Sequence, residues 1–141
     1  MQLVSGQKIA LNQLIQNDKK FTLRVQFKAS FDVDISSFGV GQKDKLFNDD
    51  YMTFYNQLKT PKCEVQYSQQ GNLNLFTFDL NKIDVSQTPR FVICATVAND
   101  QATMQNIQSG QIDLVNQQGE VLAIYQLNAS DFSQEQAVML I

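Results

Sequence analysis

The 141-residue sequence predicts an all-β fold, an antiparallel sandwich or barrel with one or two short helical segments. Three observations support this prediction. Apolar and polar residues alternate with a period of two in several segments, as they do when one face of a strand is buried. Turn-forming Gly, Pro, Asn and Ser residues fall between those segments. Segments with the apolar spacing of an amphipathic helix are scarce.

The predicted strands are short and rich in β-branched and aromatic residues. Residues 21–27 alternate apolar and polar side chains at every position. Residues 91–97 are apolar at nearly every position, which is typical of a central strand covered on both faces. The other predicted strands are residues 31–36, 51–55, 73–80 and 121–127.

Two segments have helical features. Residues 99–107 begin with Asn99, a residue that caps helices well. The weakly helical apolar positions of this segment are Ala102, Met104 and Ile107. Residues 130–136 are predicted to add one turn, with Ser133 as its cap and Gln136 three residues later.

Composition excludes several classes of function. The sequence has no histidine, which removes histidine bases, Ser-His and Cys-His nucleophilic systems and the usual zinc sites. The net charge is −3 and the basic residues are scattered, so we expect no nucleic-acid partner. No apolar run approaches the roughly 20 residues that span a bilayer, and the N-terminus has no secretory apolar region. We therefore expect no membrane span.

The two cysteines, Cys63 and Cys94, are too few for a disulfide framework. We interpret them as buried thiols, and a redox pair is the alternative. A reducing cytoplasm is therefore the expected location.

The most informative segment is residues 31–38, Phe-Asp-Val-Asp-Ile-Ser-Ser-Phe. Alternate residues of a strand share a face. The apolar face comprises Phe31, Val33 and Ile35. The polar face comprises Asp32, Asp34 and Ser36. Two carboxylates on one face repel each other unless water screens them or a hard cation binds between them. These residues alone leave both alternatives open.

Residues 31–38 resemble the Phe-Asp-Leu-Asp-Ala-Ser-x-Phe signature of the tellurium-resistance (TerD) domain family. Residues 54–61 resemble that family's Phe-Tyr-Asn-(Asn/Gln)-Leu-Lys-Ser-Pro motif. Three further segments resemble TerD motifs in the family's order: residues 3–11, 95–107 and 119–138. The resemblance implies a single TerD-like antiparallel β-sandwich domain over residues 1–141. It leaves open that this is the N-terminal domain of a longer protein.

The family binds calcium through its Asp-x-Asp segment and an acidic loop, Gly-Asp-Asn-x-x-Gly-x-Gly-Asp-Gly-Asp-Asp-Glu. The resemblance therefore implies Asp32 and Asp34 as calcium ligands, assisted by Asn56 or a loop amide. The acidic loop is shortened here, because residues 68–74 (Ser-Gln-Gln-Gly-Asn-Leu-Asn) contain no carboxylate. Calcium affinity depends largely on ligand charge and rigidity, so we expect calcium binding to be weak or lost. The family's C-terminal Gly-Glu-Leu-Tyr-Arg stretch and Trp-containing strand are also absent from residues 1–141.

The function that we expect is a non-enzymatic stress-response or tellurium-resistance domain. It would act as a protein-interaction module within a stress-response or tellurium-resistance complex, with a degenerate calcium site. The alternative is a functional calcium-binding TerD-type domain that couples cation binding to partner assembly. An enzyme is less well supported, because no nucleophile–base pair or Gly-rich cofactor loop can be assembled. An acid–base pair formed by Asp32 and Asp34 stays open.

Overall fold

The computed structural model describes residues 1–141. Its strands are β1 (Gln2–Leu3), β2 (Lys20–Lys28), β3 (Val33–Val40), β4 (Met52–Thr53), β5 (Val65–Gln70), β6 (Leu73–Asp79), β7 (Arg90–Val97), β8 (Ser109–Asn116), β9 (Val121–Leu127) and β10 (Ala137–Met139). Its helical segments are α1 (Leu11–Ile15) and the 3₁₀ turns η1 (Gln42–Asp44), η2 (Asp49–Tyr51), η3 (Met104–Asn106) and η4 (Ala129–Asp131).

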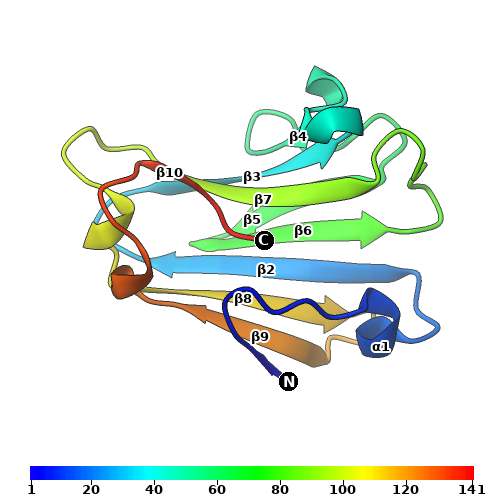
Figure 1. Ribbon diagram of the computed structural model, residues 1–141, viewed down its shortest axis with the longest axis horizontal. Helices are drawn as coiled ribbons and strands as arrows, with labels where there is room; N and C mark the ends of the chain where they lie inside the picture. Colours follow the sequence, from blue (N-terminus) through cyan, green and yellow to red (C-terminus); the bar gives the residue numbers. More distant parts are fainter.

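The strands form two sheets that pack against each other (Figure 1). One has six strands in the order β1-β9-β8-β2-β6-β5, and the other has four in the order β10-β7-β3-β4. All neighbours are antiparallel except β1 and β9, which are parallel. The structure therefore confirms the predicted antiparallel β-sandwich.

The core lies between the two sheets and receives alternate residues of their strands. In β2 the four odd-numbered residues, Phe21, Leu23, Val25 and Phe27, are buried, and the even-numbered ones are at least partly exposed. The six-stranded sheet contributes Val25 and Phe76, and the four-stranded sheet contributes Ile35 and Ile93, all within one cluster. Full burial of each such side chain stabilises the fold by roughly 1.5–3 kcal/mol. The period of two in the sequence is thus the pattern that defines the core.

Five predicted strands are confirmed, as β2, β3, β6, β7 and β9. The predicted strand at residues 51–55 is wrong in extent, because only Met52–Thr53 pair with β3. Phe54 and Gln57 exchange backbone hydrogen bonds and so close a tight turn in place of a longer strand. β5 and β8 were not predicted.

The predicted helix at residues 99–107 is wrong. The Asn99 side chain accepts a hydrogen bond from the backbone N–H of Gln101, and the chain then forms only the 3₁₀ turn η3. Thr103 and Asn106 cap this turn reciprocally, so local side-chain bonds compete with a longer helix. The apolar positions Ala102, Met104 and Ile107 are nevertheless buried in the core.

The turn predicted at residues 130–136 occurs earlier, as η4, and is capped by Asn128 instead of Ser133. Gln136 already lies beside β7, where its carbonyl accepts a hydrogen bond from Val97. The only α-helix is α1, which was not predicted. Its Leu11, Leu14 and Ile15 side chains pack against the core. No helix has the length and hydropathy that crossing a membrane requires.

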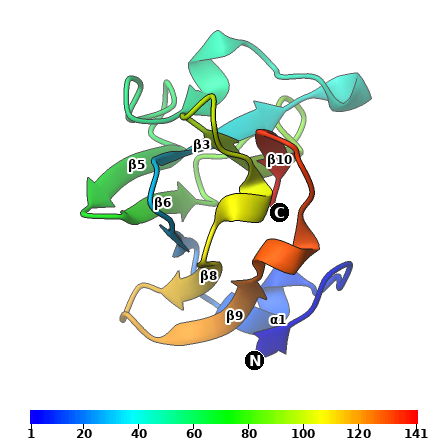
Figure 2. The ribbon, with the colours of Figure 1, turned by 90° about the vertical axis from the view of Figure 1, so that its left-hand side faces the viewer.

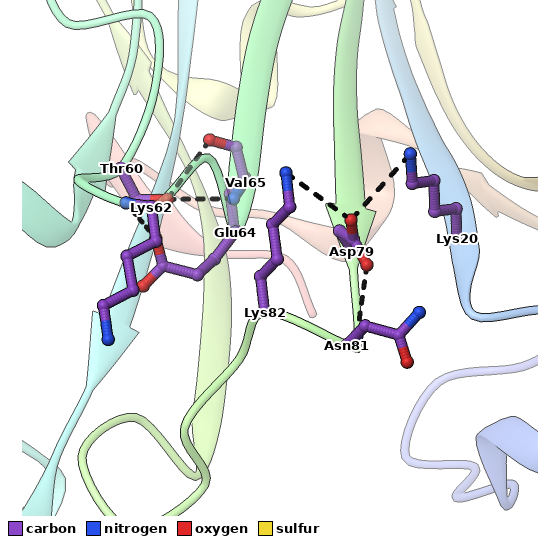
Figure 3. A network of polar contacts seen from close by, with 8 residues as sticks. All are labelled: Lys20, Thr60, Lys62, Glu64, Val65, Asp79, Asn81 and Lys82. Atoms are coloured by element: carbon purple, nitrogen blue, oxygen red, sulfur yellow. Dashed lines mark hydrogen bonds and ion pairs between the residues drawn. The ribbon is translucent and has the colours of Figure 1, made fainter.

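A polar network lies where β5 begins and β6 ends (Figure 3). The Asp79 carboxylate lies 3.8 Å from the ammonium groups of both Lys20 and Lys82. Glu64, the residue before β5, is 2% exposed, and its side chain accepts a hydrogen bond from the backbone N–H of Lys62 at 2.7 Å. These polar contacts lie at one end of the six-stranded sheet.

The opposite end of the sandwich faces the viewer in Figure 2. There the chain crosses from β2 to β3, that is from the six-stranded sheet to the four-stranded sheet, and the β5–β6 hairpin turns nearby. The conspicuous Asp-x-Asp segment lies at this end, because β3 begins there.

Candidate functional site

A groove of about 600 Å³ lies between the β2–β3 connection and the β5–β6 hairpin. Its lining residues are Phe27, Lys28, Ala29, Phe31, Asp32, Val33, Asp34, Ile35, Tyr55, Tyr67, Gln69, Gly71, Asn72, Asn74 and Gln108. Asp32 and Asp34 are both among them, so the structure brings the two sequence-predicted carboxylates together in one concave site.

The start of β3 positions this pair. The backbone carbonyl of Asp32 accepts a hydrogen bond from Ala98, and Asp34 lies opposite Thr96 of β7. Asp32 is exposed and Asp34 is half-buried, whereas Ile35 is buried in the core. Ser36, the third residue of the predicted polar face, is buried and does not line the groove.

Two buried polar side chains on the hairpin also line the groove. Tyr67 and Asn74 are 7% and 5% exposed, and the Tyr67 hydroxyl donates a hydrogen bond to the Asn74 side-chain oxygen. The Asn74 amide nitrogen donates to the backbone carbonyl of Val25. Burial raises the pKa of the Tyr67 hydroxyl above its ordinary value, and the negative charge of Asp34 raises it further. The hydroxyl therefore stays neutral beside the carboxylates.

The β5–β6 hairpin, which forms one wall of the groove, has a very short turn. Gln70 pairs with Leu73, so only Gly71 and Asn72 form the turn. Gly71 has φ of +61°, the left-handed conformation that glycine adopts readily at the first position of a two-residue turn. The Asn72 side-chain oxygen accepts a hydrogen bond from the amide of Gln26 at 3.1 Å. Neither turn residue carries a carboxylate.

Asn56, the third ligand suggested by the sequence, is exposed and does not line the groove. Its neighbour Tyr55 does, with 57% of its surface exposed. Sequence reasoning missed Tyr67 and Asn74. The signal that could have found them is the Gly71-Asn72 turn, which places both residues on the inner face of one hairpin.

The electrostatics of the groove are acidic. The four ion pairs of the chain are Lys20–Asp79, Arg24–Asp113, Lys82–Asp79 and Arg90–Asp44, so neither groove carboxylate has a cationic partner. Lys28 is the one basic residue that lines the groove. Asp32 also lines an adjoining hollow of about 580 Å³ with Asp100. No three acidic or thiol side chains converge as a metal-binding cluster.

A β-sandwich with a carboxylate pair at one end is thus the class of protein that fold and groove define. The model of the TerD domain family matches residues 1–141, the whole chain, and the chain belongs to that family. No curated protein matches it.

A solved structure shares the fold. It is described as the crystal structure of unknown function protein SAV2460 and is similar with a TM-score of 0.65 at 16% sequence identity. The match covers 89% of this chain and 79% of that one.

Proposed function

We propose that this TerD-family chain is a non-enzymatic domain of a tellurium-resistance or general stress-response system. It acts by binding partner proteins, and its calcium site is degenerate. The observation that carries the proposal is the two-residue turn between β5 and β6, which leaves no loop to supply further carboxylates to Asp32 and Asp34.

The oxygen atoms around the groove do not fit a tight calcium site. Calcium takes six to eight oxygen ligands, and strong sites use several carboxylates. The groove offers two carboxylates, while the side-chain oxygens of Asn72 and Asn74 already accept hydrogen bonds from Gln26 and Tyr67. Either amide oxygen could add a ligand through its second lone pair, but it would bring no negative charge to the ion. A degenerate site is the reading that these contacts support.

The groove also lacks the parts of a catalytic site. Its titratable side chains are Asp32, Asp34, Lys28, Tyr55 and Tyr67, and no nucleophile–base pair is found among them. The pKa of Tyr67 is shifted upward, away from the range in which a phenol serves as a base at neutral pH. Both cysteines are free thiols but only half-buried, so the interpretation of them as buried thiols is wrong. Unpaired cysteines are the usual state in a reducing compartment, which supports the proposed cytoplasmic location.

Calorimetric titration with calcium tests the degenerate site. We expect no heat of binding below millimolar calcium for the wild-type chain and none for Asp34→Asn. Micromolar binding that Asp34→Asn abolishes would overturn the proposal and establish a functional calcium-binding domain. Glu120→Gln, at an exposed residue that lines neither the groove nor the adjoining hollow, is the control for a general loss of surface charge.

A further inference from the structure

The groove has the charge and shape for a cation other than a metal ion. Two carboxylates and one lysine line it, an excess of one negative charge (2 − 1), and no cation of the chain pairs with either carboxylate. An organic cation needs fewer oxygen ligands than calcium does. A guanidinium group is weakly hydrated and can be held by one or two carboxylates through its fixed fork of N–H donors.

Aromatic side chains are the second feature of the groove. Phe31, Tyr55 and Tyr67 line it together with the carboxylates. The exposed Tyr55 ring is steadied by an edge contact with Phe54, with ring centroids 5.3 Å apart. A guanidinium plane stacks on such faces, and the attraction is about 0.5–1 kcal/mol at exposed sites. Carboxylates beside aromatic rings favour arginine over a bare metal ion.

An exposed apolar residue adjoins the groove. Leu58 is 56% exposed, and its backbone carbonyl accepts a hydrogen bond from the backbone N–H of Tyr67 at 2.7 Å, so it is held beside the groove. Together with Tyr55 it provides a surface against which the chain around a bound arginine can pack. The site is therefore larger than one side chain.

From this charge complementarity we infer that the groove binds an arginine side chain of a partner protein, whose guanidinium pairs with Asp32 and Asp34 and packs against Tyr55. The inference rests on the proposed function, because it names the partner chemistry of the same groove. Lys28 opposes binding, since it is the one cation at the groove. Its removal should therefore strengthen binding, which a role in general stability would not do.

The test is a titration of the ¹⁵N-labelled full chain with N-acetyl-arginine methylamide, followed by amide chemical shifts at low ionic strength. We expect saturable shifts at β3 and the β5–β6 hairpin. The citrulline analogue, of the same shape without charge, should cause none. Asp34→Asn should weaken binding by about tenfold or more, as loss of a charged hydrogen-bond acceptor does. Lys28→Gln should tighten it, and Glu120→Gln, at an exposed carboxylate that lines neither the groove nor the adjoining hollow, should leave it nearly unchanged.

Each contrary result overturns the inference. Absence of saturable shifts would do so, as would equal binding of citrulline or of N-acetyl-lysine methylamide, or unchanged binding by Asp34→Asn. The spectra of the variants report whether they are folded, so loss of binding is separated from loss of structure. Micromolar calcium binding in the earlier titration would overturn the degenerate site alone, whereas failure to bind arginine would leave the degenerate site standing.

Discussion

The Tyr67 hydroxyl donates a hydrogen bond to the side-chain oxygen of Asn74, and this bond joins β5 to β6 at the groove. The Asn74 amide nitrogen in turn donates to Val25 of β2 at 3.2 Å. Three adjacent strands are thereby tied together by one buried amide. The acidic pair therefore shares the groove with a buried tyrosine and a buried asparagine that are bonded to each other.

Tyr67→Phe should destabilise the fold although it removes only one oxygen atom. The Asn74 oxygen would be left buried without a donor, and an unsatisfied buried acceptor costs about 1–3 kcal/mol. Urea unfolding of the variant measures this loss. Tyr55→Phe, at an exposed ring, is the matched control and should change the free energy of unfolding by less than about 0.5 kcal/mol. Equal effects of the two variants would contradict the assigned hydrogen bond.

Strands could be predicted where the side-chain pattern alone determines the structure. β2 has one face in the core and one in solvent, so its alternation is visible in the sequence. β8 follows the same rule less clearly, because its outer face carries Asp113 paired with Arg24 while Leu114 and Val115 lie at a bulge. Residues 99–107 were wrongly predicted to be helical because their apolar residues reach the core from a turn. That arrangement depends on long-range contacts, such as the backbone hydrogen bond that Met104 donates to Glu135.

The groove was predictable only in part, for a related reason. Asp32 and Asp34 stand out locally because two carboxylates flank one residue of a strand. Tyr67 and Asn74 do not stand out in the sequence, because polar and aromatic residues are common in alternating strands. Only the register of the β5–β6 hairpin brings these two side chains together. Asn56 was suggested by a motif match, but the turn after β4 leaves it outside the groove.

Gly110→Ala should be strongly destabilising because there is no space for a methyl group. A Cβ at this position would lie 2.6 Å from Cε1 of the buried Phe27 ring. Overpacking of this kind costs about 1–3 kcal/mol. Thermal and urea unfolding measure the effect. Gly119→Asn is the control, since that residue has φ of +84° with nothing within 4 Å, and asparagine tolerates this conformation. A near-neutral Gly110→Ala would show that the start of β8 is loosely packed.

The buried Glu64 should make the stability depend on acid pH. Burial acts to raise the pKa of Glu64, but hydrogen bonds with its own backbone, Thr60, Lys62 and Tyr51 outweigh burial and lower the pKa below its ordinary value. A depressed folded-state pKa stabilises the fold above the ordinary pKa, and this contribution is lost as the pH falls through the folded-state value. Glu64→Gln should therefore be less stable than wild type at neutral pH, and the difference should shrink below about pH 4.

Urea unfolding at pH 7 and at successively lower pH gives this comparison for Glu64→Gln. The exposed Glu120 provides the control, because Glu120→Gln should follow the wild-type curve throughout. A Glu64→Gln curve parallel to that of wild type over the whole acid range would mean that Glu64 is not the group responsible.

Restoring the acidic loop should restore calcium binding. The change replaces Gly71 and Asn72, the whole β5–β6 turn, by the family's Gly-Asp-Asn-x-x-Gly-x-Gly-Asp-Gly-Asp-Asp-Glu sequence. Lengthening a surface loop costs only about 0.6 kcal/mol per doubling, so the sandwich should still fold. The added carboxylates would complete a site with Asp32 and Asp34, and affinity should reach about 10⁻⁵ M or tighter. Calorimetry measures the affinity, and at a hundredfold excess over Kd calcium should stabilise the chain by about 2.7 kcal/mol.

The matched control for this graft is a loop of the same length in which every Asp and Glu is changed to Asn or Gln. It should fold equally well and bind no calcium, because it supplies amide oxygens without charge. Asp34→Asn in the acidic graft should weaken binding, since the ion would lose a carboxylate of β3. If the acidic graft folds but does not bind calcium, the short β5–β6 turn is not the reason for the weak calcium site. The reason would then be the positions of Asp32 and Asp34 themselves.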